Sequence, residues 1–245
     1  MIKNLYFQYG AKTKNWVLQD INLMIPENKV TAIVGVSGSG KTTLIKLLLK
    51  FYTPNQGQIM IGGIDLKNIH TDFWRKNVGT VMQDGYLFAD TISRNITESD
   101  SDGLMNKEKL INAVNLANLG EFVDALPNGF KTRIGSSGMN ISGGQRQRVF
   151  IARAVYKDPK FLFFDEATSS LDANNESLIM KNLESFYRHR TVVIVAHRLS
   201  TVKNADQIVV LDKGKIVEIG KHTDLVNNRG YYYTLIKNQL ELGNT

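Results

Sequence analysis

A glycine-rich segment near the amino terminus constrains the fold more than any other part of the chain. Residues 35–42 read Gly-Val-Ser-Gly-Ser-Gly-Lys-Thr and match the pattern G-x-x-x-x-G-K-T, with Thr43 following. The apolar run 30–34 precedes the segment and is typical of a buried strand, while residues 43–49 begin a helical pattern. Glycines let the backbone curl so that several N–H groups face one anion, and the dipole of the following helix favours phosphate. The segment therefore predicts a phosphate-binding loop between a strand and a helix.

The residue types in this loop suit a phosphate chain. Lys41 carries a cation that can reach the β- and γ-phosphates, and the Thr42 hydroxyl can ligate Mg²⁺. We expect every residue of the segment to lie against the phosphates, namely Gly35, Val36, Ser37, Gly38, Ser39, Gly40, Lys41, Thr42 and Thr43. The alternative is a chance match in an ordinary glycine turn, and the flanking strand and helix argue against it.

The composition restricts the possible partners and compartments. Of the 245 residues, 42% are hydrophobic and 22% are charged, as in an ordinary globular protein. The formal net charge is +7, but the lysines are scattered along the chain, so we expect no nucleic-acid partner. Cysteine is absent, which excludes disulfides. No run approaches the roughly 20 apolar residues of a membrane helix, and the amino terminus resembles a strand rather than a signal peptide.

Hydrophobic periodicity predicts strands at the amino end. Residues 2–9 alternate between apolar and polar side chains, which is typical of an edge strand. Further apolar runs lie at 16–18, 21–25 and 58–61, and the last of them ends at two glycines. We therefore expect an antiparallel β element around the strand that precedes the phosphate loop.

The rest of the chain is first helical and then alternates between strands and helices. From about 72 to 158 the pattern is helical, with the strongest helices predicted over 104–126 and 145–157. The alternation that follows predicts a parallel sheet covered on both faces. Its predicted strands are 160–164, 191–195 and 207–211, its helices lie near 174–187 and 198–204, and a strand over 215–220 precedes terminal helices over 222–242.

Two carboxylates stand at the end of the most apolar strand. Residues 161–164 read Phe-Leu-Phe-Phe, and Asp165 and Glu166 follow. Parallel sheets place ligands at the carboxyl ends of their strands. We expect Asp165 to hold Mg²⁺ through water, and Glu166 to polarise an attacking water as a general base. The alternative is a solvated strand end, which the phosphate loop in the same chain disfavours.

A second glycine motif opens the helix that precedes this strand. Residues 141–148 read Ile-Ser-Gly-Gly-Gln-Arg-Gln-Arg. Together with the Asp-Glu pair, this motif resembles the signature of ATP-binding-cassette (ABC) ATPases, and the resemblance covers essentially the whole chain. It implies an α/β fold of the P-loop NTPase type: a RecA-like parallel sheet core, an N-terminal antiparallel β subdomain and an inserted α-helical subdomain. It assigns residues 1–82 and 159–245 to the catalytic core, and about 84–158 to the helical subdomain.

The resemblance also assigns roles to residues outside the two glycine motifs. Tyr9 resembles the aromatic residue that stacks on adenine, and Gln83 the glutamine that links Mg²⁺ and water to the helical subdomain. Asp172 lies in the loop that crosses to a partner subunit, and His197 resembles the histidine that contacts the γ-phosphate. The implied catalytic residues are Glu166, His197, Lys41 and Gln83, and the implied metal ligands are Thr42, Gln83 and Asp165.

A two-fold dimer with two bound ATP molecules follows from the same resemblance. Each ATP would lie between the phosphate loop of one copy and the signature of the other. The signature residues are Ser142, Gly143, Gly144 and Gln145. A hydroxyl and N–H groups at a helix N-terminus form an anion site, and an isologous dimer suits two-fold symmetry.

Other segments resemble the exporter branch of the family. Residues 91–96 read Thr-Ile-Ser-Arg-Asn-Ile shortly after Gln83, and residues 196–200 read Ala-His-Arg-Leu-Ser. Such exporters usually carry a membrane domain ahead of the ATPase in one chain. Because Tyr9 lies close to Met1, we expect this chain to be an excised domain of a longer exporter that works at the cytoplasmic face of the cell membrane.

Two departures refine the expected substrate. Ile141 replaces the usual leucine of the signature, which is a conservative change. Residues 135–138 read Gly-Ser-Ser-Gly where many exporters carry Gly-Glu-Arg-Gly, which disfavours a charged contact to the membrane domain. This segment resembles exporters of bacteriocins and other secreted peptides, including those with an amino-terminal cysteine peptidase domain, so we expect a peptide substrate.

Several alternatives stay open at the level of sequence. The chain could be a free-standing ATPase subunit of another transporter, or a cassette of a lipid or drug exporter. A cassette of DNA repair or translation usually has long coiled insertions or two cassettes in one chain, and neither is present. A non-catalytic regulatory cassette is disfavoured because every chemical position is intact.

Overall fold

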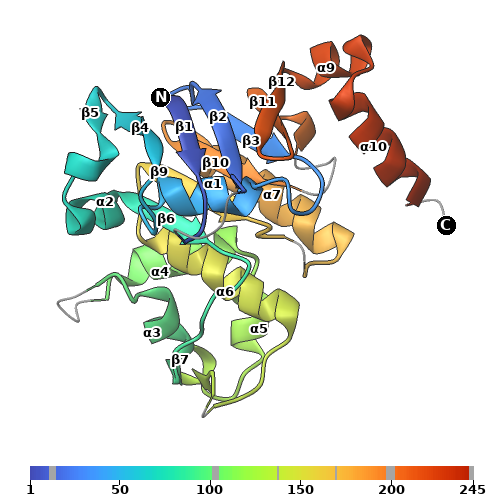
Figure 1. The fold of residues 1–245 in the computed structure, drawn as a ribbon. Coiled ribbons are helices and arrows are strands. Elements are labelled where there is room, and N and C mark those ends of the chain that lie inside the picture. Colours follow the sequence, from blue (N-terminus) through green and yellow to red (C-terminus); the bar gives the residue numbers. More distant parts are fainter. Residues whose placement is uncertain (11–14, 101–104, 137, 169, 197–201, 243–245) are drawn as a thin grey trace. The chain divides into compact units, whose positions relative to one another are not determined.

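Figure 1 shows the chain as a computed structural model, which describes residues 1–10, 15–100, 105–136, 138–168, 170–196 and 202–242. The chain divides into two compact units. The first unit is Met1–Arg75 together with Thr191–Thr245, and the second is Lys76–Arg190. Within the described ranges, every helix is too short or too polar to span a bilayer.

The first unit contains a four-stranded antiparallel sheet in the order β2-β1-β4-β5. Its strands are β1 Ile2–Phe7, β2 Leu18–Leu23, β4 Gln56–Ile61 and β5 Ile64–Asp65. Ile2 pairs with Leu23 of β2 on one side and with Ile59 of β4 on the other. The prediction that residues 2–9 form an edge strand is therefore wrong, because alternation reports one buried face and not the number of neighbouring strands. The two strands expected at 16–18 and 21–25 are instead the single strand β2, which begins at the end of the first run and ends within the second.

The same unit contains the parallel strands that lead into the phosphate loop. The strand β3 (Val30–Val34) lies between β10 (Thr191–Val195) and β11 (Gln207–Asp212), parallel to both. The strand β12 (Lys215–Gly220) pairs with β11 in the antiparallel direction. All but the first residue of β3 are buried, so β3 is a central strand whose position is fixed from both sides. The strands predicted over 191–195, 207–211 and 215–220 are confirmed as β10, β11 and β12.

Helices complete the first unit. They are α1 Lys41–Leu48, the short 3₁₀ helix η1 Leu66–Asn68, α9 His222–Asn228 and α10 Tyr231–Leu242, and α2 Thr71–Asn77 leads out of the unit. The buried Trp74 of α2 donates its indole N–H to the Leu48 carbonyl oxygen over 3.0 Å, which ties α2 to the end of α1. The terminal helices predicted over 222–242 are confirmed, whereas most of the helix expected near 198–204 lies outside the described residues.

The second unit contains a pair of parallel strands, β6 (Val78–Val81) and β9 (Phe161–Asp165), in which Val81 pairs with Phe164. The strand β9 is confirmed at its predicted place. The strand β6 was expected to be part of a helical stretch over 72–158, which is wrong for these residues. The strand β6 is only four residues long. Its second residue, Gly79, packs so closely on Pro159 that a Cβ atom would lie 2.7 Å from the proline ring.

Helices are the main regular elements of the second unit. They are α3 Ile92–Ile96, α4 Lys107–Leu116, α5 Gly120–Asp124, α6 Gly143–Tyr156 and α7 Ala173–Tyr187, with η2 Gly129–Lys131 and the short strands β7 Asp90–Thr91 and β8 Arg133–Ile134 between them. The helices expected near 145–157 and 174–187 are confirmed as α6 and α7. The prediction of a single helix over 104–126 is wrong, because these residues form two helices, α4 and α5. Asn118 between them adopts φ +53°, a left-handed conformation that interrupts a right-handed helix and that asparagine tolerates.

The turn between β11 and β12 braces the phosphate loop through Gly214. Its N–H donates to the Ser39 carbonyl oxygen over 3.1 Å, and its own carbonyl accepts the Gln19 N–H over 2.8 Å. Gly214 has φ +76°, and a Cβ atom there would lie 2.4 Å from the Val17 carbonyl oxygen. This position therefore requires glycine for both its backbone conformation and its contacts.

We expect Gly214→Ala to lower the free energy of unfolding by about 3 kcal/mol or more, because backbone strain and a clash with main-chain atoms add together. Gly63→Ala is the matched control. Gly63 occupies the corresponding turn between β4 and β5 at φ +85°, yet no heavy atom lies within 4 Å of its Cβ position. The control should cost only about 1–2 kcal/mol of strain. Equal losses for the two variants in urea titrations would contradict the bracing contact.

Candidate functional site

The phosphate loop follows β3 and ends where α1 begins at Lys41. Gly40 caps α1 in a left-handed conformation, with φ +105°. The Lys41 side chain turns back into the loop, where its ammonium group donates to the carbonyl oxygens of Gly35 at 2.8 Å and Val36 at 3.0 Å. Only 5% of Lys41 is exposed. The loop thus curls around its own cation, beside the N-terminus of a helix.

Two of the loop glycines are required by close packing. At Gly35 a Cβ atom would lie 2.1 Å from the Leu211 carbonyl oxygen, and at Gly40 it would lie 2.7 Å from the Leu18 side chain. At Gly38, with φ +78°, a Cβ atom would meet no heavy atom within 4 Å. The loop therefore packs tightly against its own unit at both ends and is open at its middle, where an anion has room to approach.

Tyr9 is joined to the phosphate loop. Its hydroxyl lies 3.0 Å from Thr43 Oγ1, and its ring packs edge-on against Phe7 and Tyr52. The residue is 39% exposed. The hydroxyl bond and the ring contacts hold an accessible aromatic side chain beside the start of α1.

The two carboxylates and Gln83 lie at one edge of the parallel pair in the second unit. Asp165 is the last residue of β9 and is fully buried, and Glu166 follows with φ +55°. Gln83 is exposed and lies two residues after β6. Because β6 and β9 are parallel and in register at Val81 and Phe164, their carboxyl ends meet at the same edge.

The predicted signature forms the N-terminus of α6. Ser142 accepts the Gln145 N–H over 3.1 Å, and the Gln145 side chain accepts the Ser142 N–H over 2.8 Å, which is a complete capping box. Gly143 and Gly144 pack near Ser170, since Cβ atoms there would lie 3.5 and 3.3 Å from its atoms. The helix start is held rigidly by its own residues, and its first turn carries no acidic side chain that would repel an anion.

Asp172 caps the following helix, α7. Its carboxylate accepts the Asn175 N–H over 2.9 Å and the Asn175 side-chain amide over 2.6 Å. These hydrogen bonds lower the pKa of Asp172 below its usual value. The Asn118 amide in turn donates to Asn175 over 2.9 Å, so the loop that carries Asp172 is tied to the break between α4 and α5.

Two polar side chains, those of Asn95 and Arg153, organise the loop before α3. The fully buried Asn95 accepts the Phe88 N–H over 2.9 Å and donates to the Phe88 carbonyl over 3.0 Å. Arg153 of α6 donates to the Asn95 carbonyl over 2.7 Å, to its side-chain oxygen over 3.0 Å and to the Tyr86 carbonyl over 3.0 Å. Asn95 belongs to the segment that resembles exporters, but the role of Arg153 had no signal in the sequence.

Each unit by itself contains groups of a distinct chemical kind. The open middle of the phosphate loop and the N-terminus of α1 suit phosphate, and a buried carboxylate such as Asp165 suits a cation. Across the described residues, no three His, Cys, Asp or Glu side chains gather into a metal-binding cluster. Mg²⁺ commonly takes only one or two protein ligands and completes its coordination with phosphates and water.

The structure thus divides the predicted residues between the two units. Tyr9 and residues 35–43 belong to the first unit. The second unit contains Gln83, the signature, the Asp165–Glu166 pair and Asp172. His197 lies outside the described residues.

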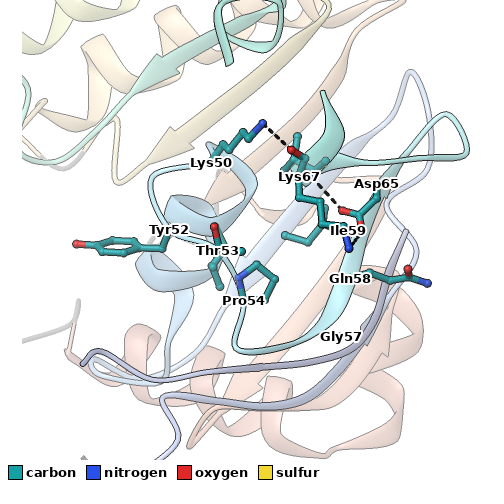
Figure 2. A pocket seen from close by; sticks show the side chains of 11 residues that line it. Lys50, Tyr52, Thr53, Pro54, Gly57, Gln58, Ile59, Asp65 and Lys67 are labelled. Atoms are coloured by element: carbon teal, nitrogen blue, oxygen red, sulfur yellow. Dashed lines mark hydrogen bonds and ion pairs between the residues drawn. The ribbon is translucent and has the colours of Figure 1, made fainter. Parts of the chain in front are cut away.

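A separate pocket of about 210 Å³ lies in the first unit (Figure 2). It is lined by the end of α1, by β4 and by η1. Lys50 donates to the carbonyl oxygens of Lys67 and Ile69, and Lys67 pairs with Asp65 over 3.3 Å. The charged groups of this pocket are therefore bonded within the chain, and we assign no ligand to it.

The chain is similar to known proteins over almost its whole length. The family model described as "ABC transporter" matches residues 18–169. The chain is 46% identical over 240 residues to the exotoxin translocation ATP-binding protein PaxB of Pasteurella aerogenes, covering 98% of this chain and 33% of that protein. It is 41% identical over 238 residues to multidrug resistance protein 1 of Entamoeba histolytica, covering 97% of this chain and 18% of that protein.

Among solved structures, a bacterial Atm1-family ABC exporter with ATP bound is similar. Its TM-score is 0.91 and its sequence is 37% identical, over 97% of this chain and 41% of that chain. This chain spans 33% and 18% of the lengths of the two relatives named above.

We expect Arg153→Lys to lower the free energy of unfolding by about 2 kcal/mol, because a single ammonium nitrogen cannot reach acceptors that three separate guanidinium nitrogens contact, so partly buried carbonyls lose their donor. The matched control is Arg146→Lys, an exposed position on the same helix, which should change stability by less than about 0.5 kcal/mol. Urea unfolding measures both variants. If Arg153→Lys lowers the free energy of unfolding no more than the control does, the guanidinium hydrogen bonds do not contribute to stability.

Proposed function

The chain belongs to the ABC transporter family and is an ATPase domain, and from this we propose that its ATP hydrolysis powers export through a membrane domain. The observation that carries the proposal is the 46% identity to a translocation ATP-binding protein over 98% of this chain. That relative is about three times as long, since this chain covers 33% of it. The membrane domain and the location at the cytoplasmic face of the membrane are therefore proposals for the longer protein.

We propose a secreted polypeptide as the exported substrate. The relatives from Pasteurella aerogenes and Mannheimia haemolytica are named as exotoxin and leukotoxin translocation proteins. The Gly-Ser-Ser-Gly segment at 135–138, which resembles peptide exporters, supports the same class. A drug is the second candidate, because the Entamoeba histolytica relative is named as a multidrug resistance protein.

We propose that residues of both units bind ATP. The phosphate loop, residues 35–43, would bind the phosphates through N–H groups and Lys41, and Tyr9 would stack on adenine. Residues 1–82 and 159–245 would form the catalytic core, with the helical subdomain at about 84–158 carrying the signature. Mg²⁺, when held by Thr42, Gln83 and Asp165, would neutralise charge on the phosphate oxygens.

Hydrolysis is proposed to depend on positioning and electrostatics. Glu166 would accept a proton from a water molecule whose oxygen forms a bond to the γ-phosphorus. The bond from this phosphorus to the bridging oxygen breaks, and ADP leaves with the electron pair. Lys41 and His197 would stabilise the negative charge on the transferred group, and Gln83 would orient the water.

A two-fold dimer is proposed as the active form. Ser142, Gly143, Gly144 and Gln145 of one copy would bind the ATP that lies on the phosphate loop of the other. The rigid capping box at the start of α6 supports a binding role, because a helix N-terminus held in one shape is a suitable anion site. Asp172 would lie in the loop that reaches the partner.

We expect Glu166→Gln to slow ATP hydrolysis by about 10² to 10⁴, because glutamine cannot accept the proton. ATP binding should persist, and an ATP-bound dimer should accumulate. Phosphate release and gel filtration with ATP measure both effects. Glu184→Gln makes the same chemical change at an exposed position on α7 and should hydrolyse at the parent rate. Hydrolysis by Glu166→Gln at the parent rate would exclude its role as base.

The shared-site dimer predicts that two inactive variants complement each other. Lys41→Met removes the phosphate-loop cation. Ser142→Asp keeps a good helix cap but places a negative charge against phosphate. Each variant should be inactive alone, whereas an equimolar mixture should recover about a quarter of parent activity, because half of the dimers are mixed and each has one intact site. A mixture that remains inactive would argue against sites shared between copies.

A further inference from the structure

The side chain of Gln147 bridges two points of the loop that follows β9. Its Nε2 donates to the Glu166 carbonyl oxygen over 2.8 Å, and its Oε1 accepts the Ser170 N–H over 2.9 Å. Gln147 lies on α6 and is only 8% exposed. We infer that Gln147 is a positioning residue for hydrolysis, which fixes the backbone of Glu166 so that its carboxylate is aimed correctly.

The chemistry of the two partners determines how the Gln147 amide is oriented. The Glu166 carbonyl can only accept a hydrogen bond, and the Ser170 N–H can only donate one. A single orientation of the amide satisfies both. Among the common side chains of similar length, methionine offers neither group and glutamate lacks the donor. Both bonds therefore depend on glutamine.

The backbone of Glu166 needs such a restraint. With φ +55°, Glu166 is in the left-handed region, which costs free energy for a residue with a side chain and is uncommon outside glycine. The direction of the Cα–Cβ bond follows from this backbone conformation. Freeing the carbonyl would let Glu166 relax, and its carboxylate would then leave the position that a general base requires.

The same helix carries the signature at its N-terminus, so one rigid element holds both groups. Gly143 and Gly144 pack close to Ser170, which allows α6 to approach the loop. Thr168 in this loop is held separately, because its hydroxyl donates to Glu176 over 2.8 Å. Gln147 is thus the side chain that joins the signature helix to the carbonyl of the proposed base.

This inference rests on the proposed role of Glu166. The test is Gln147→Met, which keeps the length and the helix propensity of the side chain but removes both hydrogen bonds. We expect single-turnover ATP hydrolysis to slow by about 10- to 100-fold, because small misplacements of reacting groups have effects of this size. The Kd for ATP should stay within about twofold, since the phosphate loop is intact.

A double-mutant cycle separates positioning from a merely structural role. If Gln147 acts through the Glu166 carboxylate, Gln147→Met should slow the residual hydrolysis of the Glu166→Gln variant by less than about twofold. Equal slowing in both backgrounds would overturn the inference. Backbone amide exchange at Ser170, which should accelerate in Gln147→Met, gives a readout that does not depend on activity.

The matched control is Gln56→Met, an exposed position on β4 in the other unit, which should leave hydrolysis unchanged. Parent-rate hydrolysis by Gln147→Met, with Glu166→Gln inactive, would overturn the positioning role and leave the proposed base in place. Parent-rate hydrolysis by Glu166→Gln would instead overturn the base itself. If Gln147→Met does not fold, Gln147→Glu, which keeps an acceptor for Ser170 and loses the donor to Glu166, should show the same loss of rate.

Discussion

The contact between Lys41 and the carbonyl oxygens of Gly35 and Val36 sets the shape of the phosphate loop. A buried ammonium group must be surrounded by acceptors, and these two carbonyls supply them, of which the Val36 oxygen also accepts the Ser39 N–H over 3.2 Å. Each group therefore satisfies the other, and the loop closes around its own cation. The Gly214 N–H holds the loop from outside through Ser39. A loop that its own hydrogen bonds hold in shape loses less of its binding energy to ordering.

The second unit solves a similar problem with a side chain from another element. The loop after β9 leaves the strand ladder at Glu166, so its backbone groups need partners from elsewhere. Gln147 of α6 supplies a donor and an acceptor to that loop. Arg153 of the same helix supplies three donors to the residues around Tyr86 and Asn95. The helix that begins with the signature thus also organises two loops, the one between β6 and α3 and the one after β9.

The accuracy of the sequence predictions follows the range of the interactions behind them. The strands β3, β9, β10 and β11 were predicted because a buried parallel strand is a continuous apolar run. The position of β1 in its sheet was predicted wrongly, since its second neighbour, β4, lies far along the chain. The helix over 104–126 was predicted as one piece, because apolar spacing continues across Asn118 while the backbone does not. Gln147 and Arg153 were not assigned roles, because each is an ordinary polar residue until its partners are known.

The sequence by itself determined the family motifs from which the chemistry of this protein is proposed. The phosphate loop, the signature and the Asp-Glu pair are short segments whose residue types and spacing already specify their local backbone and functional groups. The tertiary structure decided the order of the strands and the side chains that hold these segments in shape. Those contacts join residues that are distant in the chain, such as Gly214 with Ser39, or a helix with the loop after a strand. No local pattern encodes them, because each depends on how the elements pack together in space.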